Sequence, residues 1–236
     1  MSLIKSKLEE QILTIEFGDT TSRNSFSLKA AEELKAVLDQ NRSKFGALVF
    51  TAPGRVFCSG GNLTDYAAMT SPEEGKRVNR KIAAILDEVS RLPVPTVCAV
   101  TGDCFGGGVE VISAFDVVLS VPHAMFALWQ RKIGLSFGWG GGKRLESRLG
   151  IHKLRQLALS ANSLSALEAM KLGLIDAVSI DERLLEDARA CAAGMSALPK
   201  APVASLKSYT PEKEKEMFES LWLNEEHAKV LAGKKK

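Results

Sequence analysis

The sequence predicts an α/β fold with a helical C-terminal part. Two near-continuous apolar runs, 95–100 and 115–121, have the composition of strands buried on both faces, as in a parallel sheet. Segments with apolar residues at helical spacing alternate with strand-like runs and then dominate the second half of the chain. With 236 residues, 45% of them hydrophobic and 25% charged, the chain is an ordinary globular protein of one or two domains.

The N-terminal elements follow from two kinds of periodicity. Residues 11–17 alternate apolar and polar positions, as a half-buried strand does, and residues 4–8 are expected to pair with them as a hairpin. Apolar residues recur at helical spacing over 27–40, which predicts a helix. The run 46–54 then predicts a short strand that ends at a Pro-Gly pair.

A helix start is encoded by Ser71-Pro72-Glu73-Glu74, which combines a capping box with a proline at the first helical position. This helix is expected to end near Leu92. Further helices are predicted from apolar spacing later in the chain: 141–149, 151–160, 165–172, 181–197 and 213–231.

Charge and cysteine usage exclude several classes of protein. The net charge of +3 is too small to indicate a nucleic-acid or membrane partner, and no apolar run approaches the ~20 residues that cross a bilayer. The polar N-terminus does not resemble a secretory signal. The cysteines have no C-x-x-C spacing and no clustered histidines. We therefore expect a cytoplasmic protein with reduced thiols and no metal site. The four cysteines are Cys58, Cys98, Cys104 and Cys191.

One stretch, TGDCFGGGVEVISAFD (101–116), places three consecutive glycines two residues before Glu110. Each glycine costs roughly 1 kcal/mol against alanine in a regular element, so three together need a reason. The stretch matches neither the Walker pattern nor the G-x-G-x-x-G dinucleotide pattern. Two explanations remain open here: close backbone packing, or N–H groups left free for a ligand.

A second glycine stretch, GRVFCSGGNLTDY (54–66), also follows a predicted strand. N–H groups at a helix start have no acceptor within the helix, and the helix dipole there favours negative charge. Two such strand ends can bracket one carbonyl oxygen from two sides.

These motifs resemble the crotonase (enoyl-CoA hydratase/isomerase) superfamily. The resemblance is carried by FCSGGNL, by PVPTVCAVTGDCFGGGVE and by FDVVLS, and it extends from the hairpin to about residue 180. It implies a spiral of ββα units over 1–180 that holds an acyl-CoA site, and a helical region over 181–236 that serves oligomerisation. It also implies a homotrimer or a dimer of trimers, with coenzyme A entering as part of the substrate and no separate cofactor.

The resemblance also assigns roles to residues. The N–H groups of Gly61 and Gly107 would form an oxyanion hole for the thioester oxygen, and Glu110 matches the first of two carboxylates that hydratases of this family use. Gln130 stands where the second carboxylate is expected, and glutamine cannot exchange a proton at neutral pH. Further residues are expected to line the substrate: Ser59, Gly60, Asn62, Gly106 and Trp129.

Several reactions remain open with one carboxylate. Hydration is expected if Glu110 acts as base and acid while Gln130 positions water, and isomerisation if Glu110 moves a proton between carbons. Decarboxylation of a malonyl-type thioester needs no base, and GWGGGKRL (138–145) resembles a segment of acyl-CoA decarboxylases. Hydratase or isomerase chemistry is the main expectation; a non-catalytic binder of acyl-CoA or RNA is the alternative from another class.

Overall fold

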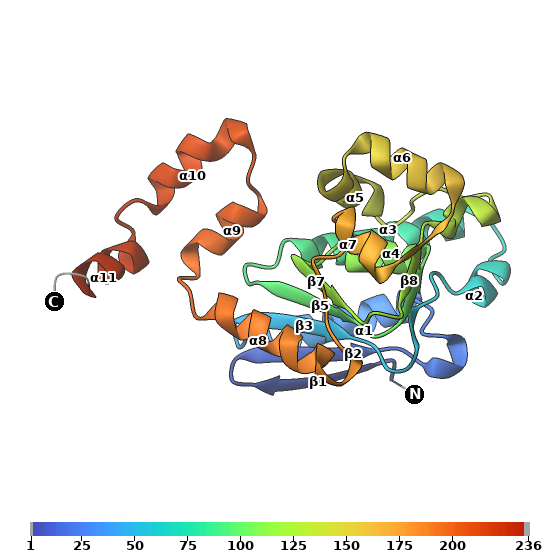
Figure 1. Cartoon of the computed structure of the whole chain (residues 1–236), viewed down its shortest axis with the longest axis horizontal. Coiled ribbons are helices and arrows are strands. Elements are labelled where there is room, and N and C mark those ends of the chain that lie inside the picture. Colours follow the sequence, from blue (N-terminus) through green and yellow to red (C-terminus); the bar gives the residue numbers. More distant parts are fainter. Residues whose placement is uncertain (1, 234–236) are drawn as a thin grey trace.

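Two β-sheets organise the part of the chain that the computed structural model describes, residues 2–233 (Figure 1). Within these residues the larger sheet has six strands and the smaller one four. The larger sheet contains, in spatial order, β1 (Ile4–Glu9), β2 (Ile12–Phe17), β3 (Ala47–Thr51), β5 (Thr96–Val100), β7 (Val117–Ser120) and β10 (Ala177–Val178). The smaller sheet contains β4 (Val56–Cys58), β6 (Asp103–Phe105), β8 (Met125–Ala127) and β9 (Ser163–Ser165).

The chain winds between the two sheets as a spiral. Each turn adds one strand to the larger sheet and the next strand to the smaller one: β3 then β4, β5 then β6, and β7 then β8. Neighbouring turns pair in parallel in both sheets. Strands β3 and β5 are buried at every position, as the continuous apolar runs predict. The expected spiral of ββα units is confirmed.

The predicted N-terminal elements are also confirmed. Strands β1 and β2 form an antiparallel hairpin, with Ile4 opposite Phe17, and its turn residues Glu10 and Gln11 have positive φ. Ser27 caps the helix α1 (Leu28–Gln40), since its side chain accepts from the Ala30 N–H. The structure therefore reproduces both the period-2 and the helical pattern.

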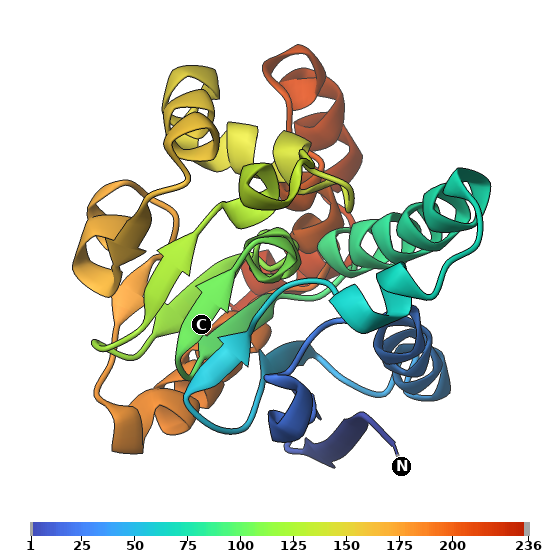
Figure 2. The same ribbon diagram turned by 90° about the vertical axis from the view of Figure 1, so that its right-hand side faces the viewer.

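Helix α3 (Pro72–Ser90) begins at the predicted cap, where the Ser71 hydroxyl accepts from the Glu74 N–H at 3.2 Å. Its apolar face, including Ile82 and Val89, is buried. Helices α1 and α3 lie side by side at one edge of the molecule (Figure 2).

The other helices in the first 200 residues either come after strands of the smaller sheet along the chain or pack on the larger sheet. Short helices α2 (Leu63–Ala67) and α4 (Gly107–Ile112) begin directly after the two glycine stretches. The others in the first 200 residues are α5 (Gly141–Leu149), α6 (Ile151–Ser160), α7 (Ala166–Lys171) and α8 (Leu184–Ser196). Helix α8 packs on the larger sheet through Leu184, Ala188 and Ala192, which are buried.

The C-terminal helices α9 (Ala201–Lys207), α10 (Glu214–Leu221) and α11 (Glu225–Gly233) extend away from the sheets (Figure 1). The predicted single helix over 213–231 is wrong: it is divided between α10 and α11. Trp222 leaves the helical conformation, and Leu223 adopts a φ of 54°, so the chain turns there. Because Lys207 donates to the Asp116 carboxylate at 2.8 Å, α9 is held at the start of β7.

Three cysteines lie in the interior, in β4, β5 and β6. Burial raises the pKa of Cys58 to about 12 and raises the pKa values of Cys98 and Cys104 well above their ordinary value of 9.0. The folded protein holds these thiols in the neutral form. Their contribution to the free energy of unfolding is therefore fully present below about pH 9. It is lost as the pH rises toward the folded-state pKa, since the unfolded chain releases these protons first.

Replacing Cys98 by alanine is expected to weaken this alkaline dependence. Between pH 9.5 and 11 the free energy of unfolding falls by about 1.4 kcal/mol per pH unit for each buried thiol. In the variant, which has one buried thiol fewer, this slope should be smaller by that amount. Urea unfolding across this range measures the slope. Cys191→Ala, which removes a less buried thiol, is the control. An unchanged slope in Cys98→Ala would contradict the prediction.

Candidate functional site

A cavity of about 410 Å³ opens where the two glycine stretches meet. Its lining comes from the loop before α2, from the start of α4 and from the 3₁₀ turn Trp129–Ile133. Arg23, which has a positive φ, contributes from the N-terminal region. All the predicted site residues except Glu110 line this cavity: Ser59, Gly60, Gly61, Asn62, Gly106, Gly107, Trp129 and Gln130.

The two glycine loops touch at Gly60. A Cβ built on this residue would lie 3.2 Å from the Phe105 carbonyl oxygen and 3.4 Å from the Gly107 nitrogen, and its φ is 106°. The Gly60 carbonyl accepts from the Phe26 N–H at 2.8 Å, and the Gly106 N–H donates to the Ala127 carbonyl at 2.8 Å. Each loop is thus fixed to a neighbouring segment by its backbone.

The hydrogen bonding of the Gly61 and Gly107 N–H groups bears directly on the oxyanion hole that the family resemblance implies. Gly107 is the first residue of α4, where an N–H has no acceptor within the helix. Within residues 2–233, neither N–H donates a hydrogen bond to another part of the chain. Both residues line the same cavity. The arrangement offers two free donors, from different loops, to a ligand oxygen.

The structure supports both explanations for the glycine stretches, close backbone packing and N–H groups left free for a ligand. A Cβ on Gly102 would lie 1.9 Å from the Arg55 carbonyl oxygen, and one on Gly108 would lie 2.7 Å from the Cys58 carbonyl oxygen. These two glycines are required by close backbone packing. Gly61 and Gly107 line the cavity, and their N–H groups have no acceptor among the described residues.

Glu110 lies in the first turn of α4, with only 2% of its surface exposed. Its carboxylate accepts from the backbone N–H groups of Gly138 (3.2 Å), Trp139 (2.8 Å) and Gly141 (3.1 Å). A fourth donor, Gln130 Nε2, lies 3.1 Å from its Oε1. A carboxylate has about four acceptor positions, so all of them are occupied. Glu110 anchors the turn that leads into α5.

Gln130 connects this carboxylate to the cavity. It lines the cavity with 9% of its surface exposed, while its amide nitrogen donates to Glu110. Its Oε1 is buried and has no hydrogen-bond partner among the described residues. The structure therefore places Gln130, Gly61 and Gly107 on one cavity. Glu110 does not line this cavity and is separated from it by the Gln130 side chain.

Two other predicted residues shape the cavity wall. Trp129 stacks on Phe105 with ring centroids 4.0 Å apart, and the Lys132 ammonium lies 4.1 Å from its ring centroid. The Asn62 side chain accepts from the N–H groups of Thr64 and Asp65, at 3.0 and 3.1 Å, and so caps α2. Asn62 fixes the loop directly after Gly61.

The sequence did not reveal three residues that pack behind the glycines: Tyr66, Asn79 and Trp139. A Cβ on Gly61 would meet the Tyr66 ring at 2.8 Å, and one on Gly107 would meet the Trp139 ring at 2.4 Å. The position of Trp139 between glycines in GWGGG was the one available signal, because a large ring there must pack on something.

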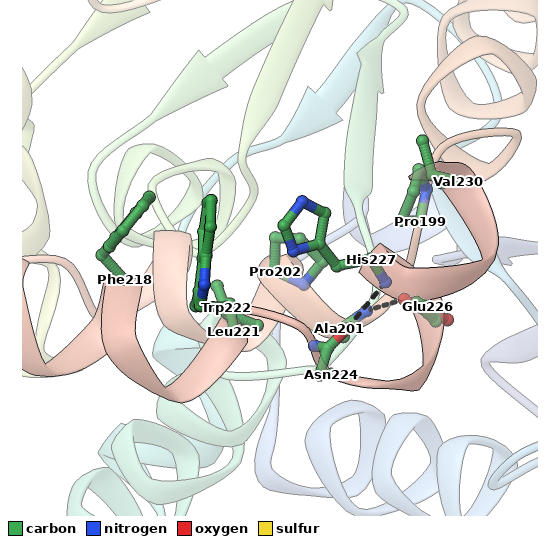
Figure 3. Close-up of a pocket in the computed structure, with 10 residues that line it drawn as sticks. All are labelled: Pro199, Ala201, Pro202, Phe218, Leu221, Trp222, Asn224, Glu226, His227 and Val230. Atoms are coloured by element: carbon green, nitrogen blue, oxygen red, sulfur yellow. Dashed lines mark hydrogen bonds between the residues drawn. The ribbon is translucent and has the colours of Figure 1, made fainter. Parts of the chain in front are cut away.

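A second cavity of about 280 Å³ lies between α9, α10 and α11 (Figure 3). It is mainly apolar, with Phe218 and Trp222 on one side and His227 on the other. The Glu226 carboxylate accepts from the Ala201 N–H at 2.7 Å and ties α11 to α9. None of the glycine-motif residues lines this cavity.

Comparison with known proteins decides the family. The family model for enoyl-CoA hydratase/isomerase matches residues 7–226. The chain belongs to the enoyl-CoA hydratase/isomerase family. Human mitochondrial methylglutaconyl-CoA hydratase is 32% identical over 207 residues, covering 84% of this chain and 60% of that protein. The chain spans about 60–65% of the length of this relative and its rat and mouse counterparts.

Two further members of the family match nearly the whole chain. The 1,2-epoxyphenylacetyl-CoA isomerase of Escherichia coli K12 is 28% identical over 239 residues, covering 99% of this chain and 91% of that protein. The structure of an enoyl-CoA hydratase from Bacillus anthracis superposes with a TM-score of 0.90 at 24% identity, covering 99% of this chain and 96% of that one. This likeness confirms the crotonase fold. Across residues 2–233, the helices are too short or too polar to cross a bilayer.

Proposed function

We propose that this protein binds an acyl-CoA thioester in the cavity of the two glycine loops and stabilises the enolate form of its acyl group. The observation that carries the proposal is the pair of unused N–H groups, Gly61 and Gly107, on one cavity. Two preorganised donors aimed at one oxygen stabilise the negative charge that develops there. The thioester oxygen would accept from both.

Hydratase or isomerase chemistry is the reaction class we favour, with Glu110 as the proton-transfer group. Three of its four donors are backbone N–H groups at the start of α5, whereas Gln130 is a side chain that can rotate. Rotation of Gln130 would free one acceptor position on Oε1 of Glu110 for a water molecule or a substrate proton, while the Gly138 N–H stays bonded to the same oxygen. The names of the relatives, a methylglutaconyl-CoA hydratase and an epoxyphenylacetyl-CoA isomerase, support a CoA thioester as substrate.

A mass-spectrometric screen tests this function. The protein is incubated with crotonyl-CoA, 3-methylglutaconyl-CoA, cinnamoyl-CoA, malonyl-CoA and methylmalonyl-CoA. Gain of water or loss of CO₂ is read from the product mass, and double-bond migration, which leaves the mass unchanged, from the chromatographic retention time of the product. The proposal predicts hydration or isomerisation of an enoyl thioester, and its loss in Glu110→Gln.

Two other outcomes of the screen would replace the proposed reaction. Loss of CO₂ that persists in Glu110→Gln would make the protein a decarboxylase. Binding without any product would make it a carrier of acyl-CoA. In a separate binding experiment, affinity for RNA that falls steeply with salt would indicate a nucleic-acid function instead.

We also propose that the C-terminal helices join copies of this chain into the homotrimer, or dimer of trimers, that the family resemblance implies. Leu206, Phe218 and Trp222 in these helices are 69%, 61% and 57% exposed. Large apolar side chains gathered on one segment mark an interaction surface. Light scattering is expected to give the mass of three or six chains, and a smaller mass for the double variant Phe218→Asp/Trp222→Asp. A single-chain mass for the unmodified protein would contradict this.

A further inference from the structure

Behind the two glycine loops, one amide oxygen links two aromatic side chains. Asn79 Oδ1 accepts from the Tyr66 hydroxyl at 2.9 Å and from the Trp139 indole N–H at 2.7 Å. The three residues come from α2, from α3 and from the turn before α5. Trp139 is 3% exposed, and Tyr66 and Asn79 are partly buried.

Each aromatic ring supports one of the two loops. The Tyr66 ring lies against Gly61, and the Trp139 ring lies against Gly107, close enough in each case that a Cβ on the glycine would overlap the ring. The two N–H groups of the candidate oxyanion hole are therefore each backed by a ring, and both rings are bonded to the same oxygen.

The hydrogen bonds fix the orientation of the Asn79 amide. Its Nδ2 donates to the Gly75 carbonyl at 2.8 Å, one turn earlier in α3, which leaves Oδ1 for the two donors. The Tyr66 hydroxyl is a donor at neutral pH, since the ordinary pKa of tyrosine is 10.0 and burial raises the pKa of Tyr66 further. Helix α3, which carries Asn79, is held in place by its buried residues Ile82, Leu86 and Val89.

We propose that Asn79 is a positioning residue that sets the placement of the Gly61 and Gly107 N–H groups relative to each other. The inference rests on the proposed function, in which both groups bind one oxygen. Strands β4 and β6, which precede the two loops, pair only over short stretches with a register shift. The hydrogen bonds of Asn79 to Tyr66 and Trp139 add a link between the elements that support the two loops. Misplacement by about 1 Å is enough to cost on the order of 100-fold in rate.

The test compares Asn79→Leu, which removes the shared acceptor at similar size, with Tyr66→Phe, which removes one donor and keeps its ring. Trp139→Phe removes the other donor and also replaces the indole that faces Gly107 by a smaller ring. The first readout is the amide NMR signals of Gly61 and Gly107 in the free protein, together with the Trp139 indole signal. The second is turnover of the thioester identified in the screen. The third is the absorption maximum of bound cinnamoyl-CoA, which moves to longer wavelength when its carbonyl is polarised.

In Asn79→Leu we expect both glycine signals to move, kcat to fall about 10- to 100-fold with KM changed less than threefold, and the absorption shift to shrink. Tyr66→Phe should move mainly the Gly61 signal and Trp139→Phe mainly the Gly107 signal. In Tyr66→Phe/Trp139→Phe, adding Asn79→Leu should change little more. If Asn79→Leu does not fold, Tyr66→Phe carries the same test, because it removes one hydrogen bond to Asn79 and leaves the ring against Gly61 in place.

The proposal is overturned if the glycine signals and the absorption shift stay at their unmodified values in these variants while only the melting temperature falls. Failure of the proposed function has a different signature. In that case the unmodified protein neither shifts the cinnamoyl-CoA absorption nor converts any thioester, while the variants still move the two glycine signals.

Discussion

Glu110→Ala is expected to lower the free energy of unfolding by about 3–6 kcal/mol and to abolish turnover. The carboxylate is the acceptor for three backbone N–H groups, of Gly138, Trp139 and Gly141, and two of these three hydrogen bonds are fully buried. Each buried N–H left without an acceptor costs about 1–3 kcal/mol. Chemical denaturation measures the loss, and turnover of the best thioester from the screen measures the activity.

Glu110→Gln separates the structural role from the proton transfer. Glutamine keeps the size and one acceptor oxygen, so the loss of stability should be smaller than in the alanine variant. It cannot exchange a proton at neutral pH, so the rate should still fall by about 10²–10⁴. A variant that keeps full activity would show that Glu110 only anchors the turn before α5.

Removing the Gly107 N–H is expected to lower kcat by about 10²–10³, the usual loss for one oxyanion donor. Replacement of Gly107 by glycolic acid exchanges the N–H for an ester oxygen and adds no side chain. This avoids the overlap with Trp139 that any Cβ would cause. Because this N–H makes no bond within the described chain, the melting temperature should change little.

The matched control is the same exchange at Gly108, the next residue of α4, which does not line the cavity. Its kcat should stay within about threefold of the unmodified protein, since this N–H does not face the thioester. Equal losses at both positions would mean that the exchange perturbs α4 as a whole, and would count against a specific role for Gly107.

Much of the fold was predictable because its signals are local. The alternation in residues 11–17, the cap at Ser71 and the apolar run 95–100 each specify one element, and each is found. The smaller sheet escaped prediction because its strands have three residues each, too few for a periodic pattern. The break between α10 and α11 was missed because Leu223, a good helix former, adopts a positive φ.

The candidate site was predictable only where its residues sit in short motifs. Gly61, Gly107 and Gln130 were placed by local patterns and the family resemblance, and the structure brings them to one cavity. The full set of donors to Glu110 was not predictable, since three come from residues 28 to 31 positions later. The link from Asn79 to Tyr66 and Trp139 joins three elements and has no counterpart in any local pattern.

The most direct measurement is a crystal structure of the protein with acetoacetyl-CoA, a thioester that has no double bond to hydrate. We expect the thioester oxygen to lie within hydrogen-bond distance of both the Gly61 and the Gly107 nitrogens, about 2.7–3.2 Å from each. A complex in which that oxygen contacts neither nitrogen, or in which the acyl group occupies another part of the protein, would contradict an oxyanion hole at these two glycines.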